Sequence, residues 1–207
     1  FFIILSLMKI SALERKNKGY IMALRRLLIA SLLLCPLLVS AHNFVIDKSV
    51  LPINITDRGE LLLNNDEISY KSWSSIELVG KVRVVQYIAG RTSAKKKNSM
   101  LIKAIKNANF PSDRFQPTTI VNTDDVILGS GFFVLGKIEK NKRRYPWAQF
   151  IIDSDGLGRK TWQLNEESST ILVLDKYGHI KWAKDGSLTP DEVHLVLSMA
   201  QKLIDEK

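Results

Sequence analysis

Runs of apolar residues separated by turn residues divide the chain into short strands. Residues 82–89 form a continuous apolar run rich in β-branched and aromatic side chains, which predicts a buried strand. The segment 51–63 alternates weakly around a turn signal at 57–59 and predicts an N-terminal hairpin. Further strands are predicted at 118–122, 149–153, 170–175 and 180–183, the last two joined as a hairpin.

Apolar residues at helical spacing predict three helices between these strands and after them. The first runs through 100–108, with Thr92 or Ser93 as a candidate N-cap and Pro111 behind it. A second helix passes through Phe132, Leu135 and Ile138 and must end before Pro146. The third begins with a capping box at 189–192, with proline in the first helical position. Strands alternating with helices predict an α/β fold: a central mixed sheet flanked by helices, with an N-terminal hairpin extension.

The start of the chain has the pattern of a secretory signal peptide. A basic pair, Arg25-Arg26, follows Met22 and precedes an apolar run that ends in small residues at Ala41. The run is shorter than the roughly 20 residues that a membrane-spanning helix needs, which disfavours an uncleaved anchor. We therefore expect residues 1–21 to be upstream translation, 22–41 to be the signal peptide, cleaved between Ala41 and His42, and 42–207 to be one domain. The mature protein is expected in the periplasm, without a transmembrane span.

Removal of the signal peptide changes both the charge and the chemistry of the chain. Residues 1–41 hold six basic residues and one acidic residue, so the formal net charge falls from +9 to +4. A charge of this size does not indicate nucleic-acid binding. The chain has one cysteine, Cys35, and it lies within the signal peptide. The mature protein is therefore expected to have neither a disulfide nor a reactive thiol, although its compartment is oxidising.

Several sequence blocks resemble known families. GKVRVV (80–85), ILVLDKYGHI (171–180) and GSLTPDE (186–192) resemble the thioredoxin/peroxiredoxin superfamily. More closely, ITDRGE (55–60), IAGRTSAK (88–95), IVNTDD (120–125), YPW (145–147) and WAKDG (182–186) resemble the YtfJ family of Gram-negative bacteria. That resemblance implies a periplasmic protein of thioredoxin-like fold. The family's biochemical role is poorly defined, and some of its records carry the label of a transcriptional regulator.

The sequence departs from the catalytic superfamily at two places. The redox cysteines are expected directly after the first buried strand, where residues 89–94 contain no sulfur. The cis-proline that faces them is expected before the 170–175 strand, where residues 167–170 contain no proline. Thiol exchange needs a thiolate, and the hydroxyl of Thr92 or Ser93 does not ionise near neutral pH.

The same stretch carries a candidate binding site for an anion. A helix start favours acidic residues, yet cations crowd this one, and exposed amides beside them suit a phosphate, sulfate or carboxylate. The alternative is a solvated basic surface. The candidate residues are Arg91, Thr92, Ser93, Lys95, Lys96 and Lys97.

Other motifs are weaker. A second basic run, 137–144, precedes Tyr145 and Trp147, and it suits either an interaction surface for lipid headgroups or a partner, or the polar face of a helix. The segment 153–156 echoes a calcium loop but lacks the acid at the twelfth position, so we expect a turn. The three histidines show no ligand spacing, although His42, as the mature N-terminus, is a remote candidate for metal binding.

We accordingly expect no cofactor, no metal and no catalytic residue. The leading hypothesis is a redox-inactive, thioredoxin-like binding or interaction protein whose partner is a periplasmic protein or a small anionic ligand. One alternative is an enzyme with non-thiol chemistry in the former thioredoxin cleft. Another is a regulatory protein, against which export and the modest charge argue.

Overall fold

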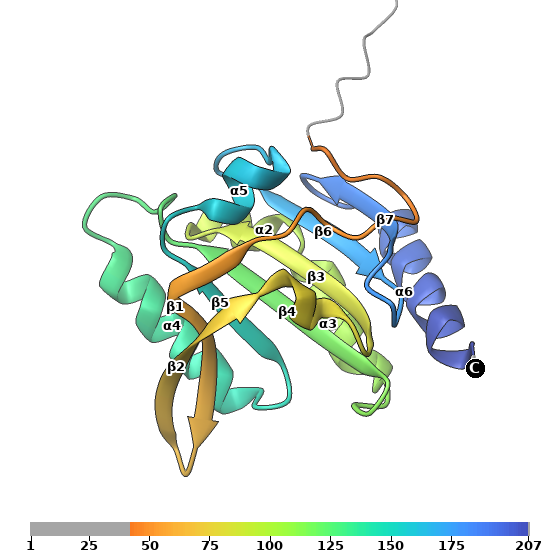
Figure 1. Ribbon diagram of the computed structural model, residues 1–207, viewed down its shortest axis with the longest axis horizontal. Coiled ribbons are helices and arrows are strands. Elements are labelled where there is room, and N and C mark those ends of the chain that lie inside the picture. Colours follow the sequence, from red (N-terminus) through yellow and green to blue (C-terminus); the bar gives the residue numbers. More distant parts are fainter. Residues whose placement is uncertain (1–41, 207) are drawn as a thin grey trace, which may run out of the picture. The chain divides into compact units, whose positions relative to one another are not determined.

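A seven-stranded mixed sheet forms the centre of the computed structural model, which describes residues 42–206 (Figure 1). The strand order is β2-β1-β5-β4-β3-β6-β7. The strands are β1 (Asn54–Asn64), β2 (Glu67–Ser74), β3 (Val82–Ala89), β4 (Phe115–Asn122), β5 (Gln149–Asp153), β6 (Ser169–Leu174) and β7 (Ile180–Asp185). The helices are η1 (Ser75–Leu78), α2 (Thr92–Lys97), α3 (Ser99–Ala108), α4 (Gly131–Arg144), α5 (Leu157–Trp162) and α6 (Pro190–Asp205).

β3 lies at the centre of the sheet, as its apolar sequence predicts. Every residue of this strand is buried, and it pairs in parallel with β4 and antiparallel with β6. β4 in turn pairs in parallel with β5, and β1 joins the other side of β5 in the antiparallel sense. A mixed sheet flanked by helices is therefore confirmed, and so is the N-terminal hairpin that extends it.

Alternate residues of β3 supply the two faces of the sheet. Val85 and Tyr87 belong to the core on the face that the N-terminal segment and α5 cover. Val84 and Ile88 point to the opposite face, where α3 and α6 pack over one half and α4 over the other. In Figure 1 the N-terminal segment (orange) crosses the sheet, while α4 (green) and α6 (dark blue) lie at opposite ends.

The face covered by α5 contains a buried polar network. The Tyr87 hydroxyl donates to an Asp153 carboxylate oxygen at 2.8 Å, and the other Asp153 oxygen accepts from the Leu157 amide at 2.9 Å. Gly158 N–H also donates to Asp153, and a Cβ on Gly158 would lie 2.4 Å from the Tyr87 ring. Asp153 thus satisfies the free amides at the start of α5. Asp153 is the first residue of the segment 153–156, which echoes a calcium loop, and its carboxylate is used in these hydrogen bonds.

The hairpin was predicted with its turn in the wrong place. β1 continues through 57–59, and the turn lies at Asn65 and Asp66, both with positive φ. Gly59 has a φ of 67°, and a Cβ there would lie 2.2 Å from the Lys71 carbonyl oxygen. The glycine therefore permits an irregularity within the strand, where the register with β2 shifts.

Two helical predictions also need correction, and one helix was missed. The first helix is divided at Asn98, whose buried side chain donates to Ser169 Oγ and the Gly186 carbonyl oxygen. Its first residue is Thr92 and its N-cap is Arg91, so neither predicted hydroxyl caps it. The sequence analysis missed α5, a six-residue helix too short to show periodicity. The capping box of α6 is confirmed, with Thr189 accepting from the Glu192 amide.

Candidate functional site

In the segment after β3, where the family resemblance led us to expect redox cysteines, Arg91 forms ion pairs with two acidic residues. Arg91 Nε lies 2.8 Å from Asp125 Oδ1, and Arg91 Nη1 lies 2.9 Å from Glu167 Oε1. The two acids come from the loops after β4 and before β6, and the Asp125 side chain is largely buried. Arg91 therefore joins the loops on either side of the position. Its charge is already matched by two carboxylates.

The place of the expected cis-proline is occupied by hydroxyl side chains. Ser168 and Thr170 both donate to Asp185 Oδ1, at 2.8 and 2.9 Å. Ser169 Oγ accepts from the Gln86 side chain, and the Ala89 amide donates to the Ser168 carbonyl. No peptide bond in residues 42–206 is cis. The loop is held by these hydrogen bonds.

The other predicted site residues are arranged around α2 and differ in surroundings. Thr92 and Lys95 line a cleft beside the helix. Ser93 and Lys96 are exposed to solvent. Lys97 Nζ donates to the Glu167 carbonyl oxygen at 3.2 Å, and so belongs to the loop contacts around Arg91. The six predicted site residues thus do not converge on one point. Two of their cations, Arg91 and Lys95, line the cleft, and of these Lys95 has no ion pair within the described chain.

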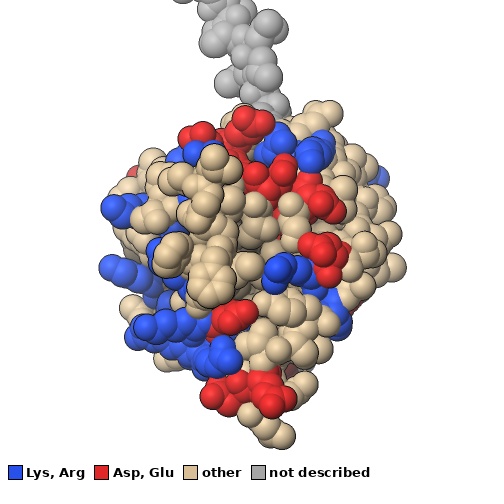
Figure 2. Space-filling view, turned by 90° about the vertical axis from the view of Figure 1, so that its left-hand side faces the viewer, with Lys and Arg blue, Asp and Glu red and all other residues tan. Residues whose placement is uncertain are grey.

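The second basic run lies along α4 and its C-terminal end, on the face that Figure 2 presents. Lys142 is buried, and its Nζ donates to the carbonyl oxygens of Pro146 and Ala148 at 3.1 and 3.0 Å. Burial lowers the pKa of Lys142. This lysine closes the turn after the helix, whereas Lys137 and Lys140 remain exposed. Figure 2 shows blue side chains gathered along one side of this face.

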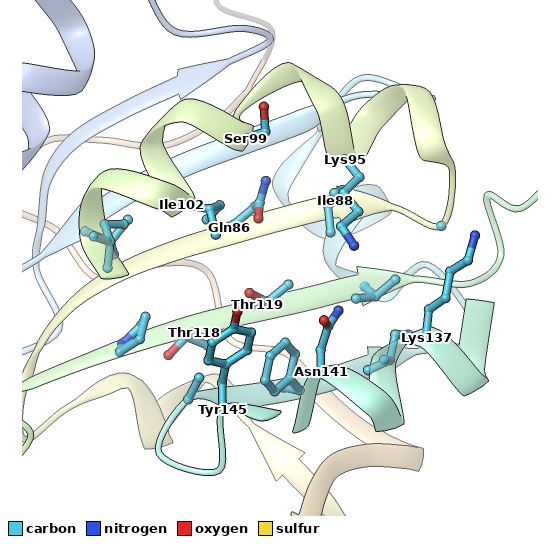
Figure 3. A pocket seen from close by; sticks show the side chains of 18 of the residues that line it. Gln86, Ile88, Lys95, Ser99, Ile102, Thr118, Thr119, Lys137, Asn141 and Tyr145 are labelled. Atoms are coloured by element: carbon cyan, nitrogen blue, oxygen red, sulfur yellow. The ribbon is translucent and has the colours of Figure 1, made fainter. Parts of the chain in front are cut away.

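A cleft of about 440 Å³ lies between α3 and α4 (Figure 3). Its apolar floor comes from the sheet and the inner sides of the helices, including Ile88, Val121 and Phe150. Polar groups of the sheet, such as Gln86 and Thr119, also border it. The cleft opens because α3 packs against α6, while α4 packs against β1 and β5, so the two helices leave the sheet between them uncovered.

Five cations and no acidic residue line this cleft in the described chain. The cations are Arg91, Lys95, Lys103, Lys106 and Lys137. Within residues 42–206 no carboxylate forms an ion pair with any of the four lysines. Low-dielectric walls that carry one sign of charge focus the electrostatic field, so an anion would be attracted here.

Aromatic residues border the cleft at the end of α4. The Lys106 ammonium lies 3.8 Å from the centre of the Tyr145 ring and lowers the pKa of the Tyr145 hydroxyl. Trp147 packs edge-on to Tyr145 and is 46% exposed. Sequence analysis singled out Lys137, Tyr145 and Trp147 without placing them at a cleft, and it missed Lys103 and Lys106. Both missed lysines lie on the polar side of a periodic helix, where only their proximity to α4 distinguishes them from solvated charges.

The described chain offers no metal centre. Residues 42–206 contain no group of three or more His, Cys, Asp or Glu side chains placed to hold a metal ion. His179 Nδ1 lies 3.5 Å from Asp175, and His42 stacks near Phe44. No helix in this part of the chain is both long enough and apolar enough to cross a membrane.

Comparison with solved structures defines the class of protein. A protein of Bacteroides thetaiotaomicron, named a proposed protein disulfide isomerase, superposes with a TM-score of 0.55 at 16% identity, over 80% of this chain and 93% of its own. A proposed thiol:disulfide interchange protein DsbE of Chlorobium tepidum gives a TM-score of 0.51 at 10% identity, over 78% of this chain and 99% of its own. At such identities the likeness concerns the fold alone, which is thioredoxin-like.

Sequence comparison then places the chain in a family. The model of the family described as a bacterial protein of unknown function (YtfJ_HI0045) matches residues 44–203, and the chain belongs to this family. The uncharacterized protein YtfJ of Escherichia coli K12 is 59% identical over 88% of this chain and 100% of its own length. An uncharacterized protein of Haemophilus influenzae Rd is 38% identical over 79% of this chain and 89% of its own.

Proposed function

We propose that this protein is a periplasmic binding protein on a thioredoxin-like scaffold, that it performs no thiol chemistry, and that the α3–α4 cleft holds an elongated apolar ligand with an anionic group. The observation that carries the proposal is the lining of the cleft, an apolar floor bordered by cations and by no carboxylate among the described residues. Its volume of about 440 Å³ falls within the usual size of small-molecule sites.

The redox part of the proposal rests on the chemistry of the residues present. Cys35 is the single cysteine of the chain, and it lies outside the described residues. The positions beside Gly90 hold hydroxyls and an ion-paired arginine, which supply no thiolate nucleophile. Full-length protein and its Cys35→Ser variant are therefore expected to be equally inactive in an insulin-reduction assay. Activity in either would contradict this part.

The ligand part rests on which charges are available. Lys95 and Lys137 lie on opposite helices across the cleft in Figure 3, and neither has an ion pair in the described chain. A ligand carboxylate or phosphate between them would meet two ammonium groups, while its apolar body would cover Ile88 and Ile102. The candidate anion site of the sequence analysis is thus proposed in a narrower form, with Lys95 retained and Lys137 added.

A dye-displacement experiment tests the ligand class. The anionic dye 1-anilinonaphthalene-8-sulfonate would be bound to the protein and displaced by laurate or by dodecanol, which share a chain but differ in charge. We expect laurate to displace the dye more strongly, and the Lys95→Gln/Lys137→Gln variant to weaken laurate binding by about fivefold, the effect of losing two partly solvated charge contacts.

Lys48→Gln/Lys202→Gln removes the same charge elsewhere and should leave binding unchanged. Equal displacement by both compounds, or equal effects of both variants, would overturn the anionic assignment.

The proposed location is tested by cell fractionation with sequencing of the protein's N-terminus. A periplasmic product that begins at His42 is expected, because the apolar run ends in small residues at Ala41. A cytosolic product of full length would contradict it and would favour the regulatory alternative.

A further inference from the structure

An apolar tip is exposed to solvent where the loop after β4 leads into the first turn of α4. It consists of Ile127, Leu128, Phe132 and Phe133, which are 60%, 100%, 83% and 69% exposed. The sequence pattern predicted Phe132 on the buried side of a helix, so its exposure corrects that prediction. Large apolar side chains clustered in this way on a surface usually mark a site of interaction with another protein or with a membrane.

The backbone presents these side chains away from the rest of the molecule. Gly129, between Leu128 and the helix, has a φ of 78°, and within the described residues no atom lies within 4 Å of a Cβ built there. Phe132 and Phe133 meet edge-on with ring centres 6.2 Å apart, so their main aromatic contact is with each other. Behind the tip the loop is anchored, since a Cβ at Gly90 would lie 2.5 Å from Val126 Cγ1.

Cations continue from the tip along one stripe of α4. Phe133, Lys137, Lys140 and Arg144 follow each other at spacings of four, three and four residues, which places them on the same side of the helix. The three cations are exposed. Figure 2 shows this face as tan surface with blue side chains beside and below it.

The two acidic residues of the loop after β4 form ion pairs. Asp125 is paired with Arg91, and Asp124 lies 3.4 Å from Lys160 Nζ. On α4 itself, Glu139 accepts from the Tyr70 hydroxyl at 2.8 Å. Glu139 keeps its negative charge, but α4 sets five cations (Lys137, Lys140, Lys142, Arg143 and Arg144) against this one acid. The helix behind the tip therefore has an excess of positive charge, which is complementary to an anionic surface.

We infer that this tip is a docking device for an anionic phospholipid surface. Apolar side chains that enter the boundary between headgroups and acyl chains, together with cations that contact the headgroups, are the two elements of peripheral membrane attachment. A protein partner fits less well, because a stable protein interface covers roughly 800 Å² on each side and four protruding side chains offer less. The inference rests on the loop and on α4. Lys137 is the one residue that it shares with the cleft, and the variants below leave that lysine unchanged.

A local fluorescent probe tests the inference in the full chain. In a Cys35→Ser background, Leu128→Cys carries the environment-sensitive dye NBD, and Leu195→Cys on α6, also exposed, carries the same dye as the control. The probe is a vesicle of phosphatidylglycerol and phosphatidylethanolamine, compared with a vesicle of phosphatidylcholine. We expect the dye at position 128 to brighten at least twofold and shift to the blue with the anionic vesicles, and the dye at 195 to remain unchanged.

Variants separate the two elements of the contact. Phe132→Asp/Phe133→Asp should abolish the response. Lys140→Gln/Arg144→Gln should lower vesicle affinity roughly 30-fold and reduce its dependence on salt. Ile76→Asp/Val79→Asp removes exposed apolar residues elsewhere and should change nothing. Equal responses at 128 and 195, or equal responses to both vesicles, would overturn the inference. So would a dye at 128 that responds only to an acidic protein. The tip variants should retain laurate binding. A negative result in the vesicle assay would therefore leave the proposed function to be judged by the dye-displacement experiment.

Discussion

The two faces of the sheet differ in how completely they are covered. On one face the N-terminal segment and α5 seal the strands, with Trp162 fully buried and Asp153 satisfied by Tyr87 and the amides of α5. On the other face α3 and α4 pack against different neighbours and leave an apolar strip of sheet between cations. The sealed face is organised for stability, because its apolar side chains are covered and its buried carboxylate, Asp153, accepts hydrogen bonds from Tyr87 and from the amides of α5. The open face keeps apolar surface and charges available, as the proposed binding site requires.

Two tryptophans give the largest expected contrast between the faces. Trp162→Ala removes a fully buried ring from the sealed face and should lower the free energy of unfolding by about 3–5 kcal/mol. Trp147→Ala, at the edge of the cleft and 46% exposed, should change it by less than about 1 kcal/mol. Urea unfolding followed by far-UV circular dichroism measures both. Similar losses for the two variants would show that the faces do not differ in this way.

The buried tyrosine of the sealed face predicts a dependence on pH. Burial and the Asp153 carboxylate raise the pKa of Tyr87 well above its ordinary value of 10.0, so the native protein keeps a proton that the unfolded chain loses. Stability contributed by this group is present below pH 10 and falls above it, by up to about 1.4 kcal/mol per pH unit.

Tyr87→Phe should therefore have two effects on the free energy of unfolding. The substitution should lower the free energy of unfolding by about 1.5–3 kcal/mol at pH 7, which is the usual contribution of a hydrogen bond to a charged group. It should also make the free energy of unfolding decline less steeply above pH 10. Urea titrations between pH 7 and 10.5 would test both, with Tyr177→Phe, whose side chain is exposed, as the control. A decline of the same slope in the variant would assign the pH dependence to other groups.

Enlarging one isoleucine on each face gives the smallest expected effect on stability. Ile120→Phe overfills the sealed core and should cost about 1–3 kcal/mol. Ile102→Phe projects into existing space at the cleft, so it should cost less than about 1 kcal/mol while weakening laurate binding. Thermal unfolding and the dye-displacement assay would measure the pair. Unchanged laurate binding in Ile102→Phe would place the ligand outside the cleft.

Local signals in the sequence were sufficient for most elements of the fold. The continuous apolar run of β3 and the capping box of α6 are both properties of neighbouring residues, and both were predicted correctly. The predicted hairpin turn was wrong because a glycine with positive φ serves a turn and an irregularity within a strand equally well. Neither periodicity nor composition distinguishes the two uses.

The candidate site was predicted less well, because its residues meet only in three dimensions. Arg91 and Lys95 are close in the sequence, yet Arg91 is neutralised by acids 34 and 76 positions away, whereas Lys95 faces the cleft and has no ion pair within residues 42–206. Lys106 and Tyr145 come together from different helices. Phe132 has the spacing of a core residue but is 83% exposed.

By itself the sequence determined most of the strand and helix pattern, the family resemblance and the lack of a thiol beside the first buried strand, because these depend on residue type and order. The tertiary structure alone decided which cations remain available, where a cleft opens, and which apolar side chains stay exposed. Those properties depend on distances between segments far apart in the chain, and on whether each charge or apolar surface finds a partner in the folded protein.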